Sequence, residues 1–139
     1  MASVYEKSVE VLLVEDNPGD ILLIRQILAH EPFPINVRVA VDGEQAIQML
    51  AQQYVKPDLV ILDLKLPKVS GFSFLQRCQL DVPVVVFSSS SSTDDVFRSF
   101  RLGAKEFFQK PTDLDAFAWQ VSQIVRNSVS PKGRVLSAS

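Results

Sequence analysis

Residues 57–63 read Pro-Asp-Leu-Val-Ile-Leu-Asp and carry the clearest fold signal in the chain. Four consecutive apolar residues, two of them β-branched, are bounded by Pro-Asp on one side and by Asp63 on the other, which is typical of a strand buried on both faces. Asp63 therefore lies where this strand ends. Because open parallel sheets bind ligands at the carboxyl ends of their strands, Asp63 is a candidate functional residue. A turn or helix-capping aspartate is the competing interpretation.

Strand and helix patterns alternate on both sides of this stretch. Helical spacing of apolar residues predicts a helix between each pair of strands and one more after Thr112 or Asp113, with Asp20 as the N-cap of the first helix. Alternating strands and helices, joined by right-handed crossovers, predict an α/β fold whose parallel sheet is covered on both faces. The further strands are expected at residues 9–14, 37–41, 83–87 and 107–108.

Length and composition limit the classes of function. A chain of 139 residues fits one domain, expected at residues 9–127, between an N-terminal extension (1–8) and a flexible tail (128–139). The initiating Met and the polar tail favour a complete single-domain product. The absence of an 18-residue apolar run and of a secretory signal, with Cys78 as the single cysteine, is typical of a cytoplasmic protein. The formal net charge of −2 argues against a nucleic-acid-binding surface, which needs a basic stripe.

Five polar side chains are expected to meet at one edge of the sheet, because the carboxyl ends of parallel strands lie together. Three carboxylates at one place repel one another unless a cation neutralises them, and oxygen ligands with room for water and a phosphoryl oxygen suit Mg²⁺. An aspartate can attack phosphorus to form an acyl phosphate, while a lysine and a hydroxyl hold the phosphoryl oxygens. The set therefore predicts phosphoryl transfer. Its members are Glu15, Asp16, Asp63, Ser88 and Lys110.

Short motifs at these strand ends resemble those of a known family. They are Val14-Glu15-Asp16, Asp42-Gly43, Asp63-Leu64-Lys65-Leu66-Pro67 with Gly71, Pro83 to Ser88, Gly103-Ala104 and Lys110-Pro111. In this order and at this spacing, the chain resembles the receiver domain of two-component response regulators, the CheY-like family, from Val9 to Val125. The resemblance implies a flavodoxin-like, doubly wound sheet of five parallel strands in the order 2-1-3-4-5, with five helices.

The resemblance also implies a role for each acidic residue. Asp63 corresponds to the phosphoacceptor, which takes a phosphoryl group from a phosphohistidine on a sensor histidine kinase or on a phosphotransfer protein. Glu15, Asp16 and Asp63, with the backbone carbonyl of Lys65, correspond to the ligands of Mg²⁺, which Mn²⁺ can replace. Such a domain is a phosphoacceptor switch rather than an enzyme, and its own catalysis is limited to phosphoryl transfer and slow autodephosphorylation.

Further positions correspond to the parts of the family that sense the phosphoryl group. Ser88 corresponds to the switch hydroxyl and Lys110 to the lysine that pairs with the phosphoryl group. Phe107 matches the switch aromatic, although a plain core aromatic of the last strand is the simpler interpretation. Ser89 is expected beside the phosphate, where its amide can bond it. The Lys110–Pro111 peptide bond is often cis in this family.

The surface formed by the last two helices and the last strand is expected to change conformation and to signal to a downstream protein. The same surface can form a homodimer, and neither a membrane nor a nucleic acid is expected as a direct partner. The turn at residues 17–20 and the loop at residues 88–96 resemble those of stand-alone receivers that serve phytochrome-type kinases.

Three alternative functions stay open. A receiver of this kind can act as a scaffold that does not depend on phosphorylation. A Mg²⁺-dependent aspartyl-phosphate phosphatase of the haloacid-dehalogenase type is disfavoured, because that family has a second aspartate where this chain has Lys65. A flavodoxin-like flavin binder would place its phosphate beside Glu15 and Asp16, which would repel it.

Lys65 is expected to face solvent, where we hypothesise that it alters how water reaches the acyl phosphate.

Overall fold

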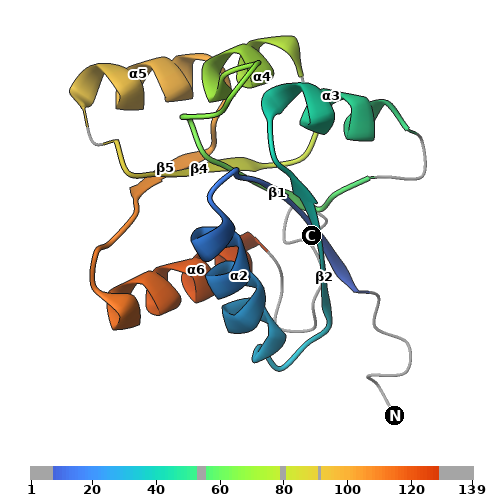
Figure 1. Ribbon diagram of the computed structural model, residues 1–139, viewed down its shortest axis with the longest axis vertical. Coiled ribbons are helices and arrows are strands. Elements are labelled where there is room, and N and C mark those ends of the chain that lie inside the picture. Colours follow the sequence, from blue (N-terminus) through green and yellow to red (C-terminus); the bar gives the residue numbers. More distant parts are fainter. Residues whose placement is uncertain (1–7, 53–55, 79–80, 91, 129–139) are drawn as a thin grey trace.

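The computed structural model describes residues 8–52, 56–78, 81–90 and 92–128, in which strands and helices alternate. The helical spacing of Ala46, Ile47, Leu50 and Tyr54 predicts that the second helix reaches Tyr54, which lies outside the described residues. The elements, labelled as in Figure 1, are β1 (Val9–Val14), α2 (Pro18–Ala29), β2 (Ile35–Ala40), α3 (Gly43–Ala51), β3 (Leu59–Leu62), α4 (Gly71–Arg77), β4 (Val84–Ser88), α5 (Thr93–Arg101), β5 (Glu106–Gln109) and α6 (Leu114–Ser128).

The strands form one parallel sheet in the order β2-β1-β3-β4-β5, which confirms the predicted flavodoxin-like, doubly wound fold. The register places the ends of the central strands side by side, since Leu62 of β3 pairs with both Val14 of β1 and Val86 of β4. The N–H of Asp63 donates to the carbonyl of Val14 at 3.0 Å. The chain therefore leaves the central strands at a common edge of the sheet.

Helices cover both faces of the sheet: α2 and α6 pack on one face, and α3, α4 and α5 lie over the other (Figure 1). Successive residues of β1 point to opposite cores, as a pleated strand requires, with Leu13 in the first core and Leu12 in the second. Every residue of β3 and β4 is buried, which explains the unbroken apolar runs in these two strands.

Helix α2 begins earlier than the sequence predicted. Asn17, and not Asp20, is the N-cap, because its side chain accepts the N–H of Asp20 at 3.1 Å. Pro18 then takes the first helical position, where the missing N–H of a proline costs the helix no bond. Asparagine and aspartate are almost equally good caps, so residue type alone does not decide between them. The carboxylate of Asp20 takes part instead in the site described below.

The end of α5 and the start of α6 follow ordinary capping rules. Gly103 lies one residue beyond Leu102, the cap residue of α5, and has a φ of +113°, a conformation that favours glycine. Asp113 caps α6, since its Oδ2 accepts the N–H of Ala116 at 2.8 Å. Helix α6 has 15 residues and ends at Ser128, one residue past the expected domain boundary. No helix in the described ranges is long and apolar enough to cross a membrane.

Candidate functional site

The strand ends bring the predicted polar residues to one edge of the sheet. Glu15 and Asp16 directly follow β1, Asp63 follows β3, and Ser88 is the last residue of β4. Lys110 follows β5, and its N–H donates to the carbonyl of Ser88 at 2.7 Å. All five residues therefore border the same site.

Three carboxylates of this site lie within reach of a single cation. One carboxylate oxygen from each of Glu15, Asp16 and Asp63 lies within 4.8 Å of the other two. Glu15 and Asp63 are buried, whereas Asp16 is exposed, so the cluster is open to solvent on one side. Mg²⁺ and similar hard cations prefer oxygen ligands and keep several waters. The donor set therefore fits a divalent cation of this kind.

The ammonium of Lys110 contacts carboxylates from three elements. Its Nζ lies 2.5 Å from Oε1 of Glu15, 2.9 Å from Oδ2 of Asp20 and 3.5 Å from Oδ2 of Asp63. An ammonium has three N–H donors, so one lysine can serve all three acceptors. Only 11% of the lysine side chain is exposed, which strengthens these contacts because little water screens them.

Burial and charge shift the pKa values of the two closest partners. Burial raises the pKa of Glu15 to about 7, and the charge of Asp63 adds to this, although the bond from Lys110 acts in the opposite direction. Burial lowers the pKa of Lys110, but its bonds to Glu15 and Asp20 and the charges of Glu15 and Asp63 outweigh that effect and raise it overall. Lys110 is therefore a fixed cation of the site, and a bound divalent cation would favour the ionised form of Glu15.

Backbone groups hold the two buried carboxylates in place. Oε2 of Glu15 accepts the N–H groups of Asp16 and Asn17 at 3.1 and 3.2 Å. Oδ1 of Asp63 accepts the N–H of Lys65 at 3.4 Å. Each carboxylate thus keeps its second oxygen for Lys110, and both point toward the same small volume.

Gly71 lets the start of α4 approach the backbone of Asp63 and Leu64. A Cβ at position 71 would lie 2.7 Å from the carbonyl oxygen of Asp63 and 2.7 Å from Cα of Leu64. The N–H of Gly71 also donates to the carbonyl of Leu64 at 3.1 Å. Only glycine allows this contact, which fixes the turn that presents Asp63.

Ser88 is fully buried and connects the site to α5. Its Oγ accepts the N–H of Ser90 at 3.3 Å, and the hydroxyl of Ser90 donates to Oδ2 of Asp95, in the first turn of α5, at 2.5 Å. Ser89 is exposed, and its carbonyl accepts a bond from the side chain of Gln109 at 3.5 Å. A displacement of Ser88 can therefore reach α5 through Ser90.

The remaining predicted residues lie around this centre. Phe107 is half-buried and packs against the core beneath α3, α4 and α5. The side chain of Lys65 is exposed, and its backbone N–H is the group that reaches Asp63. The Lys110–Pro111 peptide bond is trans, because no cis peptide bond occurs in the described residues, so the cis bond expected from the family is wrong for this chain.

Asp20 belongs to the site, although its place in the sequence predicts a helix cap. Its contact with Lys110 joins residues that are 90 positions apart in the chain. A signal for this was present: Ile24 and Leu28 follow Asp20 at spacings of four residues and are buried, which places Asp20 on the helix face turned toward the domain.

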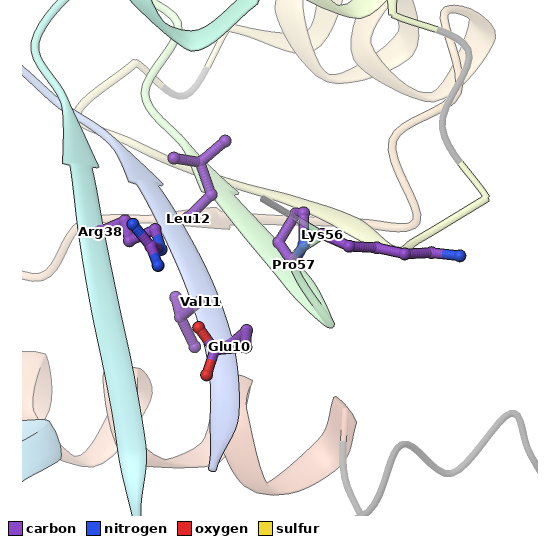
Figure 2. Close-up of a pocket in the computed structure, with 6 residues that line it drawn as sticks. All are labelled: Glu10, Val11, Leu12, Arg38, Lys56 and Pro57. Carbon is purple, nitrogen blue, oxygen red and sulfur yellow. The ribbon is translucent and has the colours of Figure 1, made fainter. Parts of the chain in front are cut away.

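A small pocket lies away from this site, toward the amino ends of β1 and β3. Figure 2 shows the residues that line it, which come from β1, β2 and the segment before β3. Its volume of about 10 Å³ has room for roughly one water molecule, so it is not a ligand cavity. The lining residues are Glu10, Val11, Leu12, Arg38, Lys56 and Pro57.

Comparison with known families identifies one that matches most of the chain. The sequence model of the response regulator receiver domain matches residues 11–121. The chain is 36% identical over 105 residues to protein-glutamate methylesterase/protein-glutamine glutaminase 1 of Myxococcus xanthus, a match that covers 74% of this chain and 30% of that protein. The chain spans less than half the length of the first curated relatives that it matches.

Two solved structures match nearly their full length. The phosphorylated cyanobacterial phytochrome response regulator RcpA is similar with a TM-score of 0.80 and 32% identity, over 90% of this chain and 99% of that one. The Mn(2+)-bound form of response regulator Rcp1 is similar with a TM-score of 0.76 and 30% identity, over 83% of this chain and 90% of that one.

Proposed function

This chain belongs to the response regulator receiver domain family of two-component signalling, and on that premise we propose that Asp63 is the residue that accepts the phosphoryl group. The observation that carries the proposal is the position of its carboxylate, 3.5 Å from the Lys110 ammonium and within 4.8 Å of the carboxylates of Glu15 and Asp16. A nucleophile, a fixed cation and a cation site thus meet at one strand end.

Glu15, Asp16 and Asp63 would hold Mg²⁺, or Mn²⁺ in its place, with the backbone carbonyl of Lys65 as a further ligand. The oxygen donor set and the similarity to the Mn(2+)-bound form of Rcp1 support a divalent cation. When bound, the cation neutralises the carboxylates and the phosphoryl oxygens as charge develops on them.

A carboxylate oxygen of Asp63 attacks the phosphorus of a phosphohistidine. The new P–O bond forms as the P–N bond breaks, and the electron pair of the broken bond returns to the imidazole of the donor. Lys110 pairs with a phosphoryl oxygen, which needs only a short movement from its present place near Asp63. Because phosphoryl transfer depends mainly on positioning and charge neutralisation, these groups suffice. Slow hydrolysis of the acyl phosphate restores Asp63, and the domain has no other catalytic role.

The phosphoryl group would change the surface formed by α5, β5 and α6 through Ser88 and Phe107. The bonds from Ser88 to Ser90 and from Ser90 to Asp95 support this route, because they link the buried hydroxyl to α5. The backbone amide of Ser89, an exposed residue, would add a bond to the phosphoryl group. Phe107 packs in the core under the same helix and is half-buried, so its ring would move without leaving a fully closed core. A partner responds to such a change only if it binds one state better than the other.

The donor would be a sensor histidine kinase or a phosphotransfer protein, and the similarity to RcpA supports a phytochrome-type kinase. A downstream protein, or a second copy of the chain, would bind the α5–β5–α6 surface, which exposes the large apolar side chains of Phe97, Phe100 and Trp119. We place the domain in the cytoplasm, as its single cysteine suggests. Its negative net charge disfavours direct contact with nucleic acid.

Intact mass measured after incubation with acetyl phosphate tests this function. The wild-type chain should gain one phosphoryl group in Mg²⁺ and none in chelator, and Asp63→Asn should gain none. Asp81→Asn, which removes the same charge at an exposed position, is the matched control and should behave as wild type.

The same measurement separates the alternatives. An unmodified wild-type chain under every condition would contradict the proposal and favour a scaffold that does not depend on phosphorylation. Steady release of phosphate at enzyme-like turnover would instead favour a phosphatase, which the exposed Lys65 two residues after Asp63 makes the weaker candidate.

A further inference from the structure

The Lys110 ammonium binds a carboxylate that lies outside the proposed cation site. Glu15, Asp16 and Asp63 form the cluster within 4.8 Å, whereas Asp20 meets it through a 2.9 Å contact with Lys110. That contact is shorter than the 3.5 Å between Lys110 and Asp63. The ammonium therefore lies closer to Glu15 and Asp20, on the side of β1 and α2, than to the acceptor Asp63.

Helix α2 fixes Asp20 in this position. The N–H of Asp20 is bonded to the cap residue Asn17 at 3.1 Å, which anchors the first turn. Its side chain lies on the same helix face as the buried Ile24 and is itself only 26% exposed. The amino end of a helix also favours a negative charge at this place. Asp20 is thus a preset counter-ion for Lys110.

We propose that Asp20 is a positioning residue that competes with the incoming phosphoryl group for Lys110. The inference rests on the proposed function, because it assumes that Lys110 pairs with the phosphoryl group on Asp63.

The competition follows from counting donors and charges. The three N–H donors of Lys110 face Glu15, Asp20 and Asp63. A divalent cation in the cluster would engage Glu15 and Asp63, which leaves Asp20 as the carboxylate that still holds the lysine. To bond a phosphoryl oxygen, Lys110 must lengthen or lose the contact with Asp20. The charge of Asp20 also repels an anionic donor. Removal of this charge, with the shape of the side chain kept, should therefore accelerate phosphorylation.

A double-mutant cycle tests the contact without any phosphoryl donor. Urea unfolding is measured in chelator for the wild-type chain, Asp20→Asn, Lys110→Met and the double variant. If the two side chains attract each other, Asp20→Asn destabilises the chain more when Lys110 is present than when it is replaced by methionine. The change that Asp20→Asn makes in the unfolding equilibrium constant should then differ by roughly threefold or more between the two backgrounds. Equal effects in the two backgrounds would overturn the proposal.

Phosphorylation kinetics test the competition itself. The second-order rate constant with acetyl phosphate, in saturating Mg²⁺, should rise roughly three- to tenfold in Asp20→Asn, as expected for one partly screened charge contact. Asp20→Glu restores the charge and should return the rate toward wild type. Glu44→Gln removes an exposed charge from the first turn of α3 and serves as the matched control, with an unchanged rate. An unchanged or lower rate in Asp20→Asn would refute the competition.

The dependence on Mg²⁺ separates this role from metal binding. Because Asp20 lies outside the cluster, the Mg²⁺ concentration that gives half of the maximal phosphorylation rate should stay within roughly twofold of the wild-type value in Asp20→Asn. Loss of a group that supports a metal ligand instead weakens metal binding about 10–100-fold. Mg²⁺ binding weakened by that factor, together with an unchanged rate constant for acetyl phosphate in saturating Mg²⁺, would overturn the proposal. If the wild-type chain accepts no phosphoryl group, the proposed function fails and the competition with it, while the urea cycle still reports on the Asp20–Lys110 contact.

Discussion

Substitution of Gly71 by alanine should reduce both stability and phosphorylation. The added Cβ would lie 2.7 Å from the carbonyl oxygen of Asp63 and from Cα of Leu64. Both are backbone atoms of a buried turn, so neither can rotate away as a side chain would. Alanine is favoured over glycine in a helix by about 1 kcal/mol, which offsets part of the clash. Overpacking of a core costs about 1–3 kcal/mol, so a net destabilisation of about 1–2 kcal/mol is expected for Gly71→Ala.

Urea unfolding measures this effect directly, since a stability change moves the midpoint and leaves the slope unchanged. Gly19→Ala is the matched control: it also lies in the first turn of a helix, but its Cβ would meet, at 3.3 Å, the end of the Asn17 side chain. That atom is Oδ1 of Asn17, which caps α2, so Gly19→Ala should have a small effect on stability, well below that of Gly71→Ala. The displaced turn in Gly71→Ala should also lower the rate of phosphorylation by acetyl phosphate. A Gly71→Ala protein as stable and as reactive as wild type would refute the close-approach argument.

Three other variants test separate parts of the site. With Lys110 present the pKa of Glu15 is raised from 4.5 to about 7, although the bond from Lys110 lowers it, so Lys110→Met should raise this pKa further. A raised pKa means that the folded chain keeps a proton that the unfolded chain releases, and stability falls as pH rises above 4.5; the fall should be larger in Lys110→Met than in wild type. In chelator, Lys110→Met should therefore lose about 1–3 kcal/mol more, relative to wild type, at pH 8 than at pH 5, and urea midpoints showing equal losses would contradict this. Ser88→Ala should still gain a phosphoryl group, but the amide NMR shifts of α5 that follow phosphorylation should shrink; shifts as large as in wild type would exclude the Ser88 route. Lys65→Ala should change the rate of phosphate loss from Asp63, and an unchanged rate would contradict a role for Lys65 in water access.

Most of the fold could be predicted from the sequence, because buried strands and helix faces appear in it as apolar runs or periodic apolar residues. The strands β3 and β4 are buried on both faces, so their apolar runs locate them nearly to the residue. The edge strands were less well delimited: β2 begins at Ile35 and contains the exposed Asn36, and the ends of β5 are the exposed Glu106 and Gln109. Edge residues are held by backbone bonds to one neighbour, and such bonds do not depend on side-chain type.

Some contacts of the site could be predicted from the sequence, and others could not. Parallel strands bring their carboxyl ends to one edge whatever the details of packing, so Asp63 and Lys110 could be placed together from the sequence. The contact of Lys110 with Asp20 depends on how the first turn of α2 packs, and the bond between Ser90 and Asp95 depends on the shape of a loop. Neither of these leaves a periodic pattern, and the structure is needed to find them.

The central claim is that Asp63 carries the phosphoryl group as an acyl phosphate, and chemical mapping tests it most directly. Borohydride reduces an acyl phosphate of aspartate to homoserine, which peptide mass spectrometry locates in the chain. After treatment with acetyl phosphate and Mg²⁺, homoserine should appear at position 63, and omission of Mg²⁺ should abolish it. Homoserine at position 16 or 20 instead, or a stable phosphate on one of the serines at positions 88–92, would contradict the account.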